Sequence, residues 1–408
     1  MSRSTDEEIE STLRHIGREA VGPAFCVYLH RVIERAHSLQ LERLLFLARE
    51  GFVFRSLYER LGGALPTSYL YVSRLSTALP AVHRFGLREL RIASRRVGER
   101  TPRDLLRTFG LDEGLLLPRM YEAGFRSATE SILEWWGDTR FDRLIEDEVF
   151  QALVRQQADA ARARLRRYLE HEGYFAQRVG LVDVGWGGTI QDALARAFRD
   201  ESTVVHGLYF GLGEAAERNG DPLALSAKEG LFADFRRHTE LPQRAIFAFV
   251  ELFEQSARAP HGTTIGYVER DGSVVPRLKE AGLDRDAERG SEPLIAALQE
   301  GIAEAAEIYV RTMPRRADER MEAAWSAVDR VVYLPTQREV RAISSLAHTV
   351  DWGGDGHMKL GASTRLPLHP GKLKRQFDSA FWKSGFLRGV GGPVLPLLYR
   401  RYLGHKRS

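Results

Sequence analysis

The chain has 408 residues, 43% of them hydrophobic, so it is long enough for two or three packed units with a large buried core. Its formal net charge of +4 comes from 59 Lys and Arg against 55 Asp and Glu, a mildly basic balance that favours anionic small substrates or an anionic membrane surface over nucleic acid. The single cysteine, Cys26, excludes an intrachain disulfide and a cysteine-based metal site, and we expect a cytoplasmic protein.

The two ends of the chain differ in character. The N-terminal stretch carries acids early and lacks the apolar core of a secretion signal. Nowhere does the sequence hold about 18 consecutive apolar residues, roughly the minimum for a membrane-spanning helix. Residues 385–408 mix Leu, Val, Phe and Tyr with five Arg or Lys. This basic tail either docks on its own domain or lies on the acidic inner face of the membrane as a peripheral contact.

The first 84 residues predict the start of an α/β core. Residues 23–41 form an apolar helix, and residues 44–48 form a buried strand that leads through a polar turn into an amphipathic helix. A second strand is expected at "SYLYVSR", residues 68–74. From residue 85 to residue 177 every segment has helical periodicity and helix-capping residues, so we predict a helical insertion there.

Strand patterns return after the insertion. They lie at "RVGLVDVG" and "TVVHGLYFGLG", with a helix between them. Residues 243–257 predict one helix, and "GTTIGYVERDGSVVPRL" predicts a hairpin that turns at Asp271-Gly272. Residues 291–348 are expected to be helical, and residues 351–364 form a Gly-rich loop before the basic tail.

Strands separated by helices predict an α/β fold with a mostly parallel, Rossmann-like sheet, a helical insertion and a helical C-terminal region. We assign residues 1–84 and 178–280 to the α/β core, 85–177 to the insertion, and 281–408 to the helical C-terminal region with its basic tail.

Ligands of parallel sheets bind beyond the carboxyl ends of the strands, and three polar stretches follow the predicted strands. These are Arg49-Glu50-Gly51, Ser73-Arg74, and Asp183 with residues 185–189. Arg74 can hold a phosphate in a two-pronged manner. Arg49 and Glu50 are either a phosphate clamp beside an acid or a solvated pair in a turn.

The turn "GWGGT" after the third strand predicts an anion site. Its glycines, Gly185, Gly187 and Gly188, allow a tight backbone turn, and the helix beginning near Thr189 offers free amides and the positive end of its dipole. The alternative is a turn that merely folds the chain, since neither the P-loop nor the dinucleotide pattern is present. Trp186 favours a ligand site, because a large aromatic in a tight turn is costly unless it packs on something such as a sugar face.

Acids occupy two further positions of interest. Asp183 stands in an otherwise apolar strand, where it either acts on a ligand or caps the next helix. Glu251 and Glu254 share one helix face, and His261 follows that helix. The alternatives are an exposed acid for Glu254 and an ordinary loop residue for His261. No second histidine stands at a ligand spacing, so a protein-held zinc is not expected.

Four stretches, "FLAREGFVFRSLYERL", "YLYVSRLSTALPAV", "LVDVGWGGTIQ" and "ELFEQSARAPHGTTIGY", resemble the glycan phosphoribosyltransferase domain of bacterial surface-polysaccharide gene clusters. The resemblance covers about residues 20–270, with a softer echo in "FDSAFWKSGFL". That domain is often fused to a haloacid-dehalogenase-type phosphatase, whose "DxDxT"-like motif this chain lacks. Where the family usually has Asp after Ala-Arg, this chain has Glu50.

The resemblance implies transfer of a 5-phosphoribosyl group from phosphoribosyl pyrophosphate to a sugar hydroxyl of a glycan or lipid-linked glycan. It implies donor-bound Mg²⁺ and a separate phosphatase as a partner that removes the 5-phosphate. The acids expected to carry the chemistry are Asp183, Glu50 and Glu254. The residues expected to bind substrate are Arg49, Gly51, Ser73, Arg74, Gly185, Trp186, Gly187, Gly188, Thr189, Gln191 and His261.

Two other functions stay open at this point. A haloacid-dehalogenase-like sugar phosphatase needs a second acid two residues after the nucleophilic aspartate, and Gly185 stands there after Asp183. A non-catalytic scaffold of a polysaccharide assembly complex would bind through the insertion and the basic tail, but it has no need of acids and arginines at three strand ends.

Overall fold

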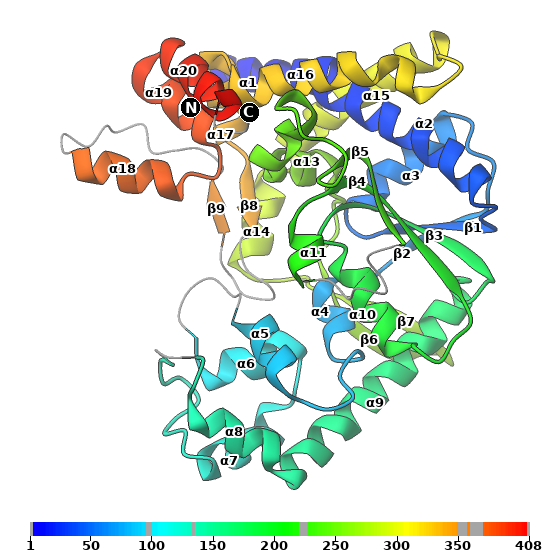
Figure 1. Ribbon diagram of the computed structural model, residues 1–408, viewed down its shortest axis with the longest axis vertical. Coiled ribbons are helices and arrows are strands. Elements are labelled where there is room, and N and C mark those ends of the chain that lie inside the picture. Colours follow the sequence, from blue (N-terminus) through cyan, green and yellow to red (C-terminus); the bar gives the residue numbers. More distant parts are fainter. Residues whose placement is uncertain are drawn as a thin grey trace.

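The protein is built on a five-stranded sheet that lies between layers of helices (Figure 1). The computed structural model describes residues 3–94, 100–132, 135–219, 227–349, 357–359 and 370–405. Within these ranges no helix combines the length and the apolar character that crossing a bilayer requires.

All five strands are parallel, in the order β2-β1-β3-β4-β5, which confirms the predicted α/β fold with a Rossmann-like sheet. The strands are β1 (Arg43–Leu47), β2 (Thr67–Leu70), β3 (Arg178–Trp186), β4 (Val204–Leu212) and β5 (Lys228–Asp234). Strand β5 was not predicted, because "KEGLFAD" begins and ends with charged residues.

Alternating side chains explain how the sheet is covered on both faces. Leu44 and Phe46 of β1 join the core that includes α2 (Gly22–Ser38), α3 (Gly51–Arg60) and α13 (Val250–Ala257). Leu45 and Leu47 point to the other face. There they join residues of α9 (Glu148–His171), α10 (Thr189–Ala197) and the hairpin of β6 (Thr264–Arg270) and β7 (Ser273–Leu278).

The segment between β2 and β3 is mostly helical, and in Figure 1 it lies below the sheet in cyan and blue-green. Residues 123–132 and 135–138 form turns and loops where helix was also predicted. A separate apolar core, running from Ala78 to Ala158, holds its helices together. Thr101 caps the first turn of one helix and Gly110, at φ 66°, ends it. The helices are α4 (Arg74–Ala78), α5 (Leu87–Ala93), α6 (Pro102–Phe109), α7 (Glu113–Glu122), α8 (Thr139–Glu146) and α9.

Helices from both ends of the chain form one layer. Helix α1 (Arg3–Ile16) packs along α15 (Glu292–Arg311), and a Cβ on Gly301 would lie 1.9 Å from the carbonyl oxygen of Arg14, so only glycine allows this approach. The remaining elements are the π-helix η1 (Gly17–Val21), α11 (Ala215–Asn219), α14 (Leu283–Gly290), η3 (Ala317–Arg320), α16 (Met321–Tyr333), α17 (Gln337–Ser344), β8 (Ala347–Thr349), β9 (His357–Lys359), α18 (Pro370–Ser379), α19 (Lys383–Gly391) and α20 (Val394–His405).

Two local predictions need correction. The single helix expected at 243–257 is a 3₁₀ helix, η2 (Pro242–Ala248), followed by α13, because Phe249 at φ −156° leaves the helical conformation and buries its ring. The second strand ends at Leu70 rather than at 74, since Ser73 caps the first turn of α4. The hairpin turn at Asp271-Gly272 is confirmed. Most of the Gly-rich loop expected at 351–364 lies outside the described residues.

Gly51→Ala is expected to destabilise the protein by about 1–3 kcal/mol, since the added Cβ would lie 2.6 Å from the carbonyl carbon of Phe46. Gly389→Ala is the matched control, because nothing lies within 4 Å of its added Cβ within helix α19. That change should be neutral or stabilise by up to about 1 kcal/mol. Urea unfolding measures both, and equal stability of the two variants would contradict the tight contact between α3 and β1.

Candidate active site

The strand order places a topological switch point between β1 and β3. From β1 the chain crosses through α3 to β2 on one side, whereas β3 and β4 continue on the other side. In open parallel sheets the crevice at such a point, beyond the carboxyl ends of the strands, is where ligands bind. Glu50 follows β1 and Asp183 lies near the end of β3, so the fold brings these two predicted acids to the same edge of the sheet.

Asp183 is a half-buried carboxylate that the sheet places opposite Tyr209. Burial raises its pKa to about 8, and the nearby Glu50 and Glu254 add to this effect, although the N–H groups of Val184 and Gly185 oppose it. It does not cap the next helix, because the N-cap of α10 is Gly188 and no side chain caps that helix. A carboxyl group that titrates near neutrality is suited to accept a proton.

Glu50 and Glu254 complete an acidic trio with Asp183. Burial raises the pKa of Glu50, and Glu254 raises it further against the opposing effect of Arg49. Burial also raises the pKa of Glu254, while Arg74 and a hydrogen bond from Trp186 oppose the shift. The acids come from three separate elements, the turn after β1, the end of β3 and α13, so convergence of the fold and not local sequence assembles them.

Arg74 belongs to the same group of charges. Burial lowers its pKa, and Glu254, Glu50 and Asp183 act against that shift. The Arg74 side chain is nevertheless exposed to solvent. Arg74 and the acidic trio therefore interact electrostatically at the switch point, where Arg74 also reaches solvent.

The glycine turn after β3 is shaped as the sequence predicts. Gly185 has φ 97°, and an added Cβ would lie 2.5 Å from the Cβ of Tyr209, so this position requires glycine. Gly188 has φ 61° and precedes α10, whose first turn begins at Thr189. Gly187 has room around it, since the nearest atom to its added Cβ is 3.6 Å away.

Trp186 has a partner that the sequence did not reveal. Its indole Nε1 donates a 2.8 Å hydrogen bond to Oε1 of Glu254, and its ring packs edge-on against Phe247 and Phe210. The backbone at Trp186 has φ 58°, a conformation that non-glycine residues rarely adopt. The residue therefore joins the turn to α13 and fixes one oxygen of Glu254, in place of the sugar contact that the sequence favoured.

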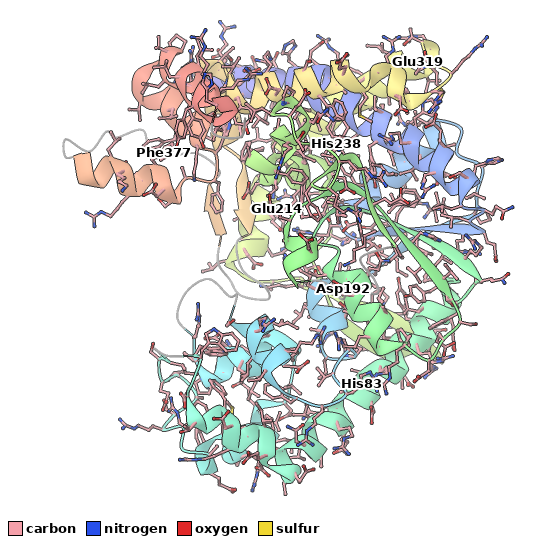
Figure 2. All side chains as sticks on the ribbon, viewed as in Figure 1. His83, Asp192, Glu214, His238, Glu319 and Phe377 are labelled. Carbon is pink, nitrogen blue, oxygen red and sulfur yellow. The ribbon has the colours of Figure 1, made fainter. Side chains whose placement is uncertain are left out.

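A buried lysine lies beneath the glycine turn. The Nζ of Lys228 donates to Oδ1 of Asp192 at 2.5 Å and to the carbonyl oxygen of Gly187 at 3.3 Å, and its side chain is fully buried. Asp192 is labelled on α10 in Figure 2. Lys228 and Asp192 thus form a buried ion pair that fixes the first turn of α10 against β5. The short apolar run at residues 231–233 was the signal that could have revealed this strand.

Two predicted binding residues have their polar side-chain atoms bound within the protein. Gln191 is 2% exposed, its Nε2 donates to the carbonyl of Val205, and its Oε1 accepts from Tyr209. The hydroxyl of Ser73 accepts from the amide of Ser76 at the start of α4 and donates to the carbonyl of Thr264 at 2.6 Å. Gly51 is likewise structural, since it brings α3 close to β1. These contacts give the three residues roles in building the site.

Arg49 is held by an acid from the C-terminal part of the chain. Its Nη1 lies 2.6 Å from Oε1 of Glu288, and Arg285 lies 3.2 Å from the other carboxylate oxygen. Arg258 donates to the Glu288 carbonyl at 3.1 Å. Burial lowers the pKa of Arg49, but the carboxylates of Glu288 and Glu50 outweigh this effect, so the pKa is raised. Two guanidinium groups thus bind the buried carboxylate of Glu288, and a third, that of Arg258, binds its backbone carbonyl.

His261 lies next to this cationic cluster. Its Nε2 is 2.7 Å from the hydroxyl of Tyr69, which donates to the carbonyl of Arg49 at 3.3 Å. Burial lowers the pKa of His261, and Arg49 contributes in the same direction, so the ring is neutral at physiological pH. The predicted histidine is therefore in the neighbourhood of the site, bonded to a tyrosine that the sequence analysis did not single out.

The acidic trio could bind Mg²⁺ only together with a ligand that supplies further oxygen atoms. In the described part of the chain no group of three or more His, Cys, Asp or Glu is arranged to hold a metal ion. The three raised pKa values nevertheless show an acidic group short of positive charge. This fits a divalent ion that arrives on a ligand's phosphates and takes one or two carboxylate oxygens from the protein.

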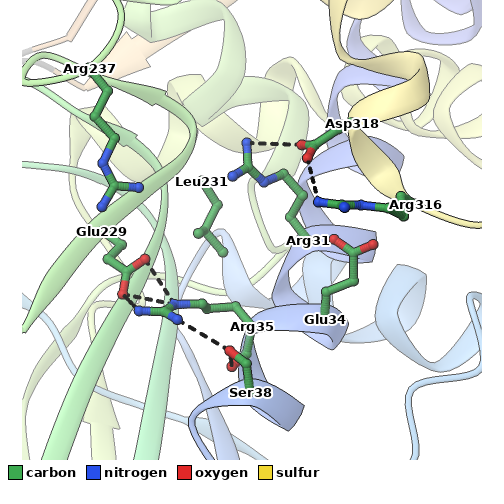
Figure 3. A pocket seen from close by; sticks show the side chains of 9 residues that line it. All are labelled: Arg31, Glu34, Arg35, Ser38, Glu229, Leu231, Arg237, Arg316 and Asp318. Atoms are coloured by element: carbon green, nitrogen blue, oxygen red, sulfur yellow. Dashed lines mark hydrogen bonds and ion pairs between the residues drawn. The ribbon is translucent and has the colours of Figure 1, made fainter.

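A well-formed cavity of about 470 Å³ lies elsewhere, beside the edge strand β5 on the face that α2 covers (Figure 3). Arg35 meets Glu229 there through hydrogen bonds of 2.9 Å, and Asp318 lies between Arg31 and Arg316. Most of the arginines that line the cavity pair with acidic side chains, as in a hydrated network of surface ion pairs. We therefore do not place the chemistry in this cavity.

Comparison with protein-family models gives no match to this chain, and comparison with curated proteins finds no significant similarity. The likeness to glycan phosphoribosyltransferases accordingly rests on the four sequence stretches.

Asp183→Asn is expected to stabilise the protein increasingly as the pH rises. The pKa of Asp183 is about 8 in the folded protein against 3.8 for a fully hydrated aspartate, so the folded state holds the proton more tightly and the wild type loses stability between about pH 4 and 8. The variant is free of this loss, which is at most about 1.4 kcal/mol per pH unit. Thermal unfolding at pH 5 and pH 8 in metal-free buffer measures the difference.

Asp147→Asn is the control, because the pKa of Asp147 is lowered, chiefly through its bond from Arg119 and helix amides against the cost of burial. Ionised Asp147 stabilises the folded protein fully at any pH above the pKa that this aspartate has in the unfolded chain. The loss of stability in Asp147→Asn should therefore be the same at pH 5 and pH 8. A constant difference for Asp183→Asn as well would contradict its raised pKa.

Proposed function

We propose that the protein is a glycosyltransferase that passes a 5-phosphoribosyl group from phosphoribosyl pyrophosphate to a sugar hydroxyl of a glycan acceptor. One observation carries the proposal. Acids from three elements, Asp183, Glu50 and Glu254, meet beside cationic side chains at the switch point of a parallel sheet. That arrangement supplies both charges that this reaction requires, positive for the two phosphate ends and negative for the reacting sugar.

The donor carries anionic groups at both ends of its pentose. The first turn of α10, which begins at Thr189 without a side-chain cap, presents backbone amides and the positive end of the helix dipole, which suit one phosphate group. Arg74, which reaches solvent, and the half-buried Arg49 suit the other. The acidic trio would then lie beside the pentose ring.

Transfer breaks the bond between the anomeric carbon and the pyrophosphate oxygen, and the electron pair leaves with pyrophosphate. A hydroxyl oxygen of the acceptor bonds to the anomeric carbon and gives its proton to Asp183, whose pKa of about 8 suits a group that accepts and then releases a proton. The carboxylate of Glu254, fixed by Trp186, faces the positive charge that develops on the ring. Mg²⁺ held by Glu50 and the donor's phosphates would neutralise the departing pyrophosphate.

The setting of the reaction is part of the same proposal. A glycan acceptor on a lipid carrier would bring the enzyme to the inner face of the membrane, and the basic tail is suited to that place. Removal of the 5-phosphate would fall to a separate phosphatase, since the chain lacks the "DxDxT" motif.

The protein is expected to bind phosphoribosyl pyrophosphate with Mg²⁺ and to unfold at a higher temperature in its presence. Ribose 5-phosphate and pyrophosphate, each alone, should stabilise it less, because each fills one of the two anion sites. Asp183→Asn should keep donor binding and reduce pyrophosphate release by at least about a hundredfold, as is typical for loss of a general base. Calorimetry and a pyrophosphate assay measure the two properties separately.

Other outcomes would support the competing functions. Release of inorganic phosphate from sugar phosphates would indicate a phosphatase. A folded protein with no response to the donor would indicate a scaffold.

Arg74→Leu is expected to weaken donor binding about tenfold or more, equivalent to about 1.4 kcal/mol, because the side chain reaches solvent beside the acidic trio. Arg55→Leu is the matched control, since Arg55 pairs with Glu59 on the outer surface of α3. Equal donor affinity of the two variants, measured by calorimetry, would remove Arg74 from the binding site.

A further inference from the structure

Helices α19 and α20 dock on the upper layer of the molecule, where Figure 1 shows them in red, while α18 projects to the left in orange. Trp382 anchors them, since its Nε1 donates to the carbonyl of Val332 at 2.8 Å and its ring stacks on Phe249 at 4.9 Å. Arg400 binds Asp329 of α16 through two oxygens at 3.2 and 2.9 Å. One side of the basic tail is therefore fixed to the body of the protein.

The opposite side of α20 is apolar and faces solvent. Val394, Leu397, Leu398 and Tyr402 are exposed by 58%, 39%, 53% and 56%. Positions 394, 398 and 402 are four residues apart and so lie along one face of the helix. The face that docks contains Tyr399 and Leu403, which pack against the main core. A helix that buries one apolar face and exposes a second is unusual for a protein surface in water.

Positive charge is concentrated in the same segment. The last 39 residues hold nine of the 59 Lys and Arg and one of the 55 Asp and Glu, so the rest of the chain is slightly acidic. Helices α19 and α20 contain no acid at all. Arg401 on α20 and Lys374 and Arg375 on α18 are exposed. The exposed apolar stripe thus lies in a strongly basic part of the chain.

We propose that the outer face of α20 binds the surface of an anionic bilayer. Its Leu and Val side chains enter the boundary between headgroups and acyl chains, while the surrounding Arg and Lys meet acidic lipid headgroups. The charge selects this occupant, because a second copy of the chain would bring the same positive surface against it. The proposal does not depend on the function of the acidic trio, since it concerns binding and not transfer.

The test is sedimentation of the full chain with lipid vesicles. We expect binding to vesicles of phosphatidylcholine mixed with phosphatidylglycerol, at least about tenfold weaker binding to phosphatidylcholine alone, and loss of binding as salt is raised. The variant V394S/L397S/L398S should bind the anionic vesicles at least about tenfold more weakly, because it removes apolar side chains that enter the bilayer. Its fold should persist, since all three residues are exposed.

The matched control is L87S/L115S/V149S, which changes three apolar residues of the helical insertion that are exposed by 63%, 50% and 54%. It should bind vesicles as the wild type does. Equal binding of wild type and the α20 variant, or equal affinity for neutral and anionic vesicles, would overturn the proposal. So would a dimer in solution, measured by light scattering, that the α20 variant converts to a monomer, because a second copy would then cover this face.

Discussion

The carboxyl groups of Asp183, Glu50 and Glu254 share one poorly hydrated space, and much of the surrounding structure serves to tolerate this. Burial raises the pKa of all three, and Glu50 and Glu254 also raise that of Asp183. Such a cluster reduces the stability of the folded protein at neutral pH. Arg74, Arg49 and the indole N–H of Trp186 offset part of the cost. A fold that retains a destabilising group of acids at a ligand crevice is typical of a functional site.

Hydrogen bonds and ion pairs from neighbouring elements hold the segments that carry these groups in place. Tyr28 of α2 donates to the carbonyl of Asp183, which fixes the backbone at the end of β3. Lys228 ties β5 to the glycine turn, and Glu288 ties Arg49 to α14. Each of these contacts joins segments that are far apart in the sequence. The site is thereby rigid at its base, and the exposed Arg74 is the charged group that can respond to a ligand.

How much the sequence could predict depended on the range of each interaction. Short apolar runs revealed β1, β3 and β4, and an acid inside such a run pointed to Asp183. A strand with polar ends, β5, escaped because its Lys228 is buried only through pairing with Asp192. The break at Phe249 depends on stacking against Trp382, and the role of Glu288 depends on an arginine 239 residues away. No periodicity within one segment encodes such contacts.

The acidic trio and the exposed face of α20 belong to one packed body, which has a consequence for an acceptor at a membrane. The main core runs without interruption from α2 through α13, α15 and α16 to Trp382, and Arg400 fastens α20 to α16. Glu254 lies on α13 within that body, and Glu288 of α14 directly precedes α15. A bilayer that held α20 would therefore also fix the orientation of the acidic trio, because no flexible linker separates them among the described residues of this core. An acceptor on a lipid carrier would then meet the acids at a defined height above the membrane, and its length would decide which hydroxyl reaches Asp183.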